Sequence, residues 1–131
     1  MARLIGVEPR NTLEDYAGIV HLIEAVNQYR QLADRVAPRL AGRTLWMVNS
    51  TEKGGGVAEM LPAMVTLLRD VGIATEWVVI ESDDPDFFAL TKRIHNLIHG
   101  AGDPQLGPAG RELFEAVNRA NAEQLRAFVH P

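Results

Sequence analysis

The stretch MVNSTEKGGGVAEML at residues 47–61 places three consecutive glycines between an apolar run and an amphipathic segment. This pattern predicts a strand, a loop and then a helix. Glycine loses more conformational freedom on folding than any other residue, so three in a row require a reason. Either the turn is sharp, or a ligand comes very close to the backbone at Gly54, Gly55 and Gly56.

The flanking segments extend this stretch into a strand–helix–strand unit. The apolar run at residues 44–49 predicts a buried strand, and apolar side chains at helical spacing follow from Val57 until Gly72. Pro62 lies inside this helix and predicts a mild kink or an early first turn. A second buried strand is expected at about residues 74–81. Two strands joined by a helix are expected to be parallel, with a right-handed crossover.

Three more helices are predicted. The first covers about residues 18–37, after a possible cap at Asn11 or Thr12. The second follows the acidic stretch at residues 83–86 and ends near Gly100, and the third has an apolar stripe within residues 111–129. The N-terminal RLIGVEP is compatible with a short edge strand or with an ordered arm. The sequence therefore predicts an α/β fold.

Composition limits the class of protein. A chain of 131 residues fits a single domain over residues 1–131. The formal net charge of −4 argues against nucleic-acid or anionic-membrane partners, and the absence of cysteine excludes disulfides and thiolate metal sites. The start, MARLIGVEPR, lacks the long apolar stretch typical of a signal peptide, and the apolar runs of the sequence are too short to span a bilayer. A cytoplasmic protein is expected.

The glycine loop is also a candidate binding site. A strand-to-helix junction presents open backbone N–H groups and the helix dipole, which favour a phosphate or a sugar near residues 50–56. The dinucleotide motif G-x-G-x-x-G fails because Glu59 occupies its last position. The P-loop also fails, since Val57 and Ala58 stand in place of its Lys-Ser/Thr pair. By pattern alone, a structural turn and a ligand contact are equally open.

Two other stretches carry polar side chains. TKRIHN places Lys92 and Asn96 on one helix face with His95 beside them, although a solvated helix face is the favoured interpretation. The acidic ESDDPD has no calcium-loop spacing and is better explained as a helix cap. No metal site and no cofactor are predicted, and no residue pattern identifies a catalytic group.

The stretch VNSTEKGGGVAEMLPAMVTLLRDVGIATEWVVIES followed by FFALTKRIHNLIHG closely resembles the N-terminal domain of glycosyltransferring trehalose synthases. The resemblance extends through EDYAGIV and NRANAEQL, from about residue 13 to residue 125, and includes the related trehalose phosphorylases. It implies a retaining glycosyltransferase of the GT-B fold. This chain would be its incomplete N-terminal half, a Rossmann-like three-layer α/β/α domain with a small parallel sheet.

The resemblance also implies partners and site residues. The N-terminal domain supplies most of the acceptor side, here for glucose, and a C-terminal domain holds an NDP-glucose donor. Ser50, Gly54, Gly55 and Gly56 would lie at the cleft between the two domains. The side chains of Lys92, His95 and Asn96 would bind sugar hydroxyls.

Enzymes of this family are much longer, so the resemblance leads us to expect that this chain lacks the donor-binding domain. We therefore expect a truncated fragment, a split gene product or a standalone relic that is inactive alone. A small sheet with unpaired edges predicts a homo-oligomer. The alternatives are a non-catalytic sugar- or nucleotide-binding module and a purely structural or oligomerisation domain whose glycine loop is only a turn.

Overall fold

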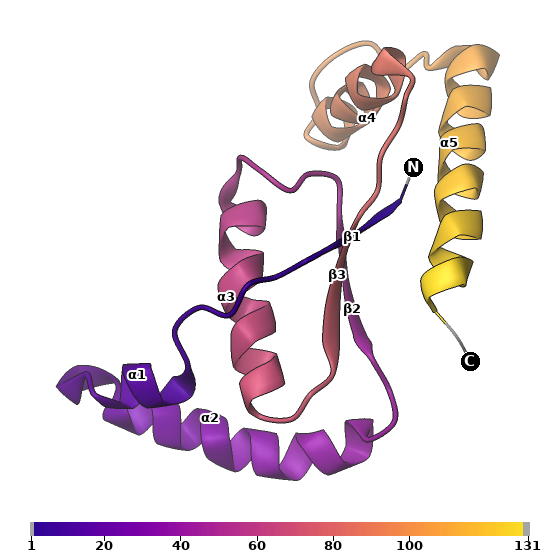
Figure 1. Cartoon of the computed structure of the whole chain (residues 1–131). Helices are drawn as coiled ribbons and strands as arrows, with labels where there is room; N and C mark the ends of the chain where they lie inside the picture. The colour runs from indigo at the N-terminus through magenta and orange to yellow at the C-terminus, as the bar shows by residue number, and fades with distance from the viewer. Residues whose placement is uncertain (1, 130–131) are drawn as a thin grey trace. The chain divides into compact units, whose positions relative to one another are not determined.

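The chain is an α/β protein, and the computed structural model describes residues 2–129 (Figure 1). Its elements are β1 (Arg3–Ile5), α1 (Leu13–Ala17), the 3-10 helix η1 (Val20–Leu22), α2 (Ile23–Val36), the 3-10 helix η2 (Ala37–Leu40), β2 (Leu45–Asn49), α3 (Gly56–Asp70), β3 (Thr75–Val79), α4 (Pro85–Ile98) and α5 (Gly107–Phe128). They form two compact units. Residues 4–79 make up the first, and the second contains residues 80–129 together with residues 2–3.

A three-stranded sheet carries the strand–helix–strand unit. The strand order is β1-β3-β2, and β2 runs parallel to β3 with Leu45 opposite Thr75 and Asn49 opposite Val79. Since α3 joins these two strands, the predicted parallel pair is confirmed. The expectation of an all-parallel sheet is wrong, because the complete sheet is mixed. The strand β1 comes from the N-terminal segment and not from a helical crossover, so nothing requires it to be parallel.

The core of the first unit lies where α3 packs on this sheet (Figure 1). Leu61 and Val65 of α3 contact Trp77 and Val79 of β3, and Ile5 of β1 completes the cluster. The side chain of Val65 is fully buried and that of Trp77 is 2% exposed. Burial of such side chains is the main favourable term in folding. The helix therefore fixes the strand pair from which the glycine loop extends.

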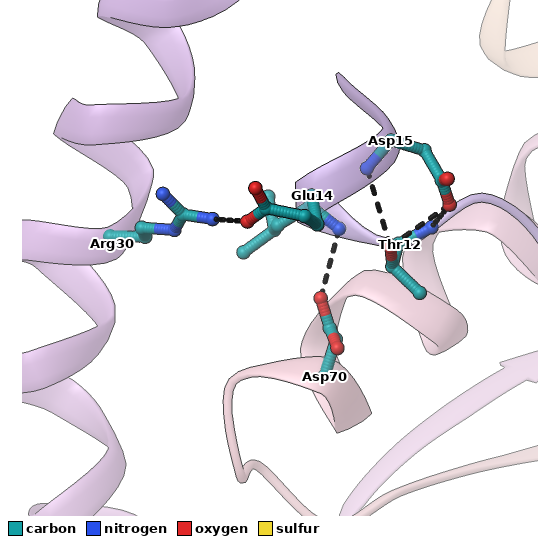
Figure 2. Close-up of polar contacts among 6 residues, drawn as sticks. Thr12, Glu14, Asp15, Arg30 and Asp70 are labelled. Atoms are coloured by element: carbon teal, nitrogen blue, oxygen red, sulfur yellow. Dashed lines mark hydrogen bonds and ion pairs between the residues drawn. The ribbon is translucent and has the colours of Figure 1, made fainter. Parts of the chain in front are cut away.

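The predicted helix over residues 18–37 is wrong in its first turn. A short helix α1 ends at Ala17, and Ile19 is extended with φ −97° and ψ 110° before η1 begins. The long helix α2 begins only at Ile23. Gly18 explains the break, since glycine is a poor residue for a helix interior. Thr12 caps α1, as one of the two predicted cap residues, and forms a capping box with Asp15 (Figure 2).

The second unit contains the last two helices. Asp84 caps α4 and Pro85 follows at its first position, which confirms the predicted acidic cap. The buried Phe87 stacks on Phe114 of α5, with ring centroids 6.3 Å apart. The helix α5 starts at Gly107, four residues before the predicted segment, because Pro108 is accommodated in its first turn.

No helix within residues 2–129 is both long enough and apolar enough to cross a bilayer.

The packing of α3 predicts opposite results for two neighbouring side chains. Leu61→Ala removes a side chain that is 6% exposed in the core and should lower the free energy of unfolding by about 2–5 kcal/mol. Met60→Ala is the matched control, because Met60 is 53% exposed on the same helix and its loss should cost within about 0.5 kcal/mol. Urea denaturation measures both values. Equal losses for the two variants would contradict this packing.

The capping box predicts the titration of Asp15. Hydrogen bonds from the Thr12 backbone N–H and then from the Thr12 hydroxyl stabilise the carboxylate, which holds the pKa of Asp15 below its ordinary value of 3.8. A lowered folded-state pKa contributes stability above the unfolded pKa, and this contribution is lost as the pH falls through the folded value. An NMR titration of the carboxyl carbon should find the lowered pKa. Thr12→Ala keeps the backbone donor and should restore only part of the shift, whereas a wild-type value at or above 3.8 would rule out the box.

Candidate functional site

Side chains at the end of β2 hold the loop that leads to α3. The Asn49 Oδ1 atom accepts a hydrogen bond of 2.8 Å from the Trp77 indole N–H, and its Nδ2 atom donates to the Thr51 carbonyl at 2.7 Å. Thr51 in turn donates its hydroxyl to the Lys53 carbonyl at 2.6 Å and accepts from the Lys53 N–H at 3.2 Å. Asn49 and Thr51 therefore tie the loop to the buried strand β3.

Backbone conformation explains why glycine is needed at two of the three positions but not at the third. Gly54 has φ 78°, and Gly55, the residue that precedes α3, has φ 86° and ψ 149°. Side chains disfavour both conformations, so the turn itself requires these two glycines. Gly56 is the first helical residue and lies outside the positive-φ region. A β-carbon at any of the three would meet no atom within 4 Å, so packing within residues 2–129 excludes none of them.

A pocket of about 370 Å³ opens beside this loop. Four parts of the first unit line it: the end of β1 with the segment that follows it, the glycine loop, the first two turns of α3, and Trp77 of β3. The lining residues are Ile5, Gly6, Val7, Glu8, Arg10, Glu52, Lys53, Gly54, Ala58, Glu59, Pro62 and Trp77. We call this space the glycine-loop pocket. Its walls come from segments far apart in the sequence.

Charges of both signs surround the glycine-loop pocket. Arg10 and Lys53 supply hydrogen-bond donors, while Glu8, Glu52 and Glu59 supply acceptors. Trp77 also lines the pocket, but it is a core residue that is 2% exposed, and its indole N–H is bonded to Asn49. Such a mixture suits a ligand with many hydroxyl groups, because each hydroxyl both donates and accepts. No group of three or more histidine, aspartate or glutamate side chains within residues 2–129 is arranged to hold a metal ion.

The predicted site residues fall into two groups. Gly54 lines the glycine-loop pocket, and Ser50, Gly55 and Gly56 belong to the same loop but not to the described lining. The other group is on α4 in the second unit, where Lys92, His95 and Asn96 are found. The His95 ring there lies 4.6 Å from the His99 ring. The described lining of the glycine-loop pocket comes from residues 4–79 alone. The ligand contacts expected for both groups stay predictions.

Sequence reasoning missed the residues that give the pocket its polarity. Glu8 and Arg10 belong to an N-terminal segment for which the pattern left strand and arm open. Glu59 entered only as a mismatch to the dinucleotide motif, and Trp77 only as a strand residue. The spacing of Glu59 from the glycines was the one available signal, because residues in the first turn of a helix lie near the loop that precedes it.

Residues 47–130 match the family model described as trehalose synthase, N-terminal domain. The chain belongs to this family. The resemblance seen in the sequence is therefore confirmed. The match includes the end of β2 from Met47 onward, the glycine loop, α3, β3 and both helices of the second unit.

Individual trehalose synthases agree with this family. The chain is 40% identical over 114 residues to trehalose synthase of Pyrococcus horikoshii and 39% identical over 113 residues to that of Rubrobacter xylanophilus. These alignments cover 87% and 86% of this chain but 26% of each relative. Trehalose phosphorylase of Grifola frondosa is 30% identical over 113 residues, with 76% of this chain and 15% of that protein covered. The chain thus spans about a quarter of the length of the trehalose synthases that it matches.

The glycine geometry separates two neighbouring substitutions. Gly55→Ala forces a side chain into a conformation that glycine alone adopts readily and should cost about 1–3 kcal/mol of stability. Gly56→Ala places alanine inside a helix with open space around it, and should be neutral or stabilise by up to about 1 kcal/mol. Thermal and urea unfolding measure both. A Gly56→Ala variant as unstable as Gly55→Ala would show that the turn requires the third glycine too.

Proposed function

We propose that the glycine-loop pocket binds the acceptor sugar, glucose, in a glycosyl transfer that forms trehalose. The observation that carries this proposal is the position of the pocket. It lies against the glycine loop of a chain that belongs to the trehalose synthase N-terminal family, and charged groups of both signs line it. The GT-B arrangement and the Rossmann-like layering of this domain are part of the same proposal.

The acidic and basic lining residues make different hydrogen bonds to the sugar. Glu8 and Glu59 accept hydrogen bonds from sugar hydroxyls, and Arg10 and Lys53 donate to the hydroxyl oxygens. Charge-assisted bonds of this kind are stronger than neutral ones. The N–H groups of Gly55 and Gly56 at the start of α3 stabilise developing negative charge on the leaving diphosphate of an NDP-glucose donor. Lys92, His95 and Asn96 are proposed as further hydroxyl contacts.

The transfer itself belongs to a larger protein in this proposal. A GT-B enzyme reacts in a cleft between two domains, and this chain corresponds to about a quarter of its trehalose synthase relatives. The pocket residues therefore supply the acceptor side, and the 131-residue chain is inactive alone. Self-association and a cytoplasmic location stay predictions.

Trehalose phosphorylases among the relatives support a second candidate function. In that case the same pocket would hold glucose during the phosphorolysis of trehalose, with inorganic phosphate in place of the leaving diphosphate. The two functions share the acceptor pocket and differ in the anion beside it. Titration of phosphate and of a nucleoside diphosphate, each in the presence of glucose, distinguishes them.

Calorimetric titration with glucose and trehalose tests the pocket. Wild-type chain should bind one or both, and Glu59→Gln should weaken that binding at least about tenfold, since a hydrogen bond to a charged group is lost. Glu24→Gln is the matched control, because Glu24 occupies the first turn of α2 as Glu59 does in α3, and Glu24 is not a lining residue. No heat with either sugar from folded protein would leave the loop as a structural turn and remove the proposed function.

A further inference from the structure

Residues 6–12 form a strap that joins β1 to α1 and crosses α3 (Figure 1). Gly6, Val7, Glu8 and Arg10 of this strap line the glycine-loop pocket. The strap has no helix or strand of its own, and Pro9 removes one of its backbone donors. Regular backbone pairing therefore does not determine where Glu8 and Arg10 lie.

Two side chains of α3 hold the strap. The Thr66 Oγ1 atom accepts a hydrogen bond of 3.2 Å from the Arg10 backbone N–H. One turn further along, the Asp70 Oδ2 atom accepts one of 2.9 Å from the Leu13 N–H, at the point where α1 begins (Figure 2). Thr66 and Asp70 are four residues apart, so they lie on the same face of the helix. Together they hold the strap at Arg10 and at Leu13, the first residue after it.

Part of the strap does not pack directly on α3, so these hydrogen bonds are important for its position. A second pocket, of about 180 Å³, lies between part of the strap and α3. Val7, Pro9 and Thr12 line it on the strap side, and Thr66, Arg69 and Asp70 line it on the helix side. Val7 packs against the core cluster and holds the first half of the strap. In the second half, where this pocket reduces the packing on α3, the hydrogen bonds to the Arg10 and Leu13 N–H groups help to determine the position of the strap.

The Thr66 hydroxyl makes one hydrogen bond within its own helix and a second one to the strap. Its hydroxyl donates to the Pro62 carbonyl at 2.8 Å, which is the usual bond of a threonine inside a helix. That bond uses the hydroxyl proton and leaves the oxygen free to accept from Arg10. The residue is 7% exposed, so water competes little for this oxygen. One buried hydroxyl thus links the turn of α3 at Pro62 to the strap.

We infer that Thr66 is a positioning residue for the glycine-loop pocket: through the Arg10 N–H it holds the strap so that Glu8 and Arg10 face the bound ligand. Asp70 is the second anchor of the same strap. Neither residue belongs to the described lining of that pocket, so both act through the strap. The inference rests on the proposed function for the nature of the ligand, but the anchoring is measurable without any ligand.

The test compares Thr66→Val with Thr66→Ser. Valine keeps the shape and removes the acceptor, whereas serine keeps the hydroxyl. In Thr66→Val the Arg10 amide should exchange with solvent about tenfold faster, and glucose or trehalose should bind up to about tenfold more weakly. Thr66→Ser should stay near wild type in both measurements. Hydrogen exchange by NMR and calorimetric titration supply the two measurements.

Thr75→Val is the matched control for a general loss of stability. Thr75 is a buried threonine of the same unit, and its hydroxyl bonds to the Ile73 carbonyl, but the residue does not line the glycine-loop pocket. This variant should unfold more easily than wild type and yet keep the Arg10 exchange rate and the sugar affinity. If Thr75→Val weakens sugar binding as much as Thr66→Val does, the effect is one of stability and the inference is overturned.

Other outcomes also decide the question. Unchanged Arg10 exchange in Thr66→Val, or equal defects in the serine and valine variants, would overturn the inference. If wild-type chain binds neither sugar while Arg10 exchange responds as stated, the anchoring stands and the proposed function fails. Should Thr66→Val not fold, Asp70→Ala and Asp70→Asn replace it. The asparagine keeps an acceptor for the Leu13 N–H and should protect that amide, whereas alanine should not.

Discussion

Burial of α3 against the parallel strands β2 and β3 is the constraint on which the rest of the first unit depends. Val65 and Trp77 are almost completely buried in this packing. The packing therefore fixes the distance and the orientation of α3 relative to the sheet. The same packing sets where the helix must begin. Because β2 ends at Asn49 and α3 begins at Gly56, six loop residues have to complete the reversal between them.

Residues of this helix outside the core cluster reach the glycine-loop pocket and the strap. Its first turns bring Ala58, Glu59 and Pro62 to the glycine-loop pocket, and its last turns bring Thr66 and Asp70 to the strap. Pro62 belongs to both ends of this arrangement, since it lines the pocket and its carbonyl accepts from Thr66. A proline inside a helix usually costs stability, because it removes one backbone bond and crowds the preceding turn. In α3 the turn that contains Pro62 lines the glycine-loop pocket. Its Pro62 carbonyl also accepts the hydrogen bond of Thr66, the residue that is bonded to the strap.

Local pattern in the sequence predicted the elements but not the walls of the site. The strands β2 and β3 and the helix α3 could be predicted because a buried strand and an amphipathic helix each repeat at a fixed period. The strand β1 has three residues and offers no such period. The position of the strap could not be predicted from the sequence, for a different reason. Its position depends on the Arg10 N–H meeting a threonine 56 residues away, and no spacing rule encodes a contact of that range.

The three glycines show how far backbone geometry explains a binding loop. Positive φ accounts for Gly54 and Gly55, so the sharp turn is a sufficient cause for two of the three. Gly56 has no such cause, since it is helical and open space surrounds its α-carbon. Alanine would make a better first turn there. Gly56 lowers the stability of the helix and is not needed for the turn. Its presence is consistent with a surface that is left open for a bound molecule. In the proposed function that is the leaving diphosphate of the donor, whose approach to the N–H groups at the start of α3 a methyl group would obstruct.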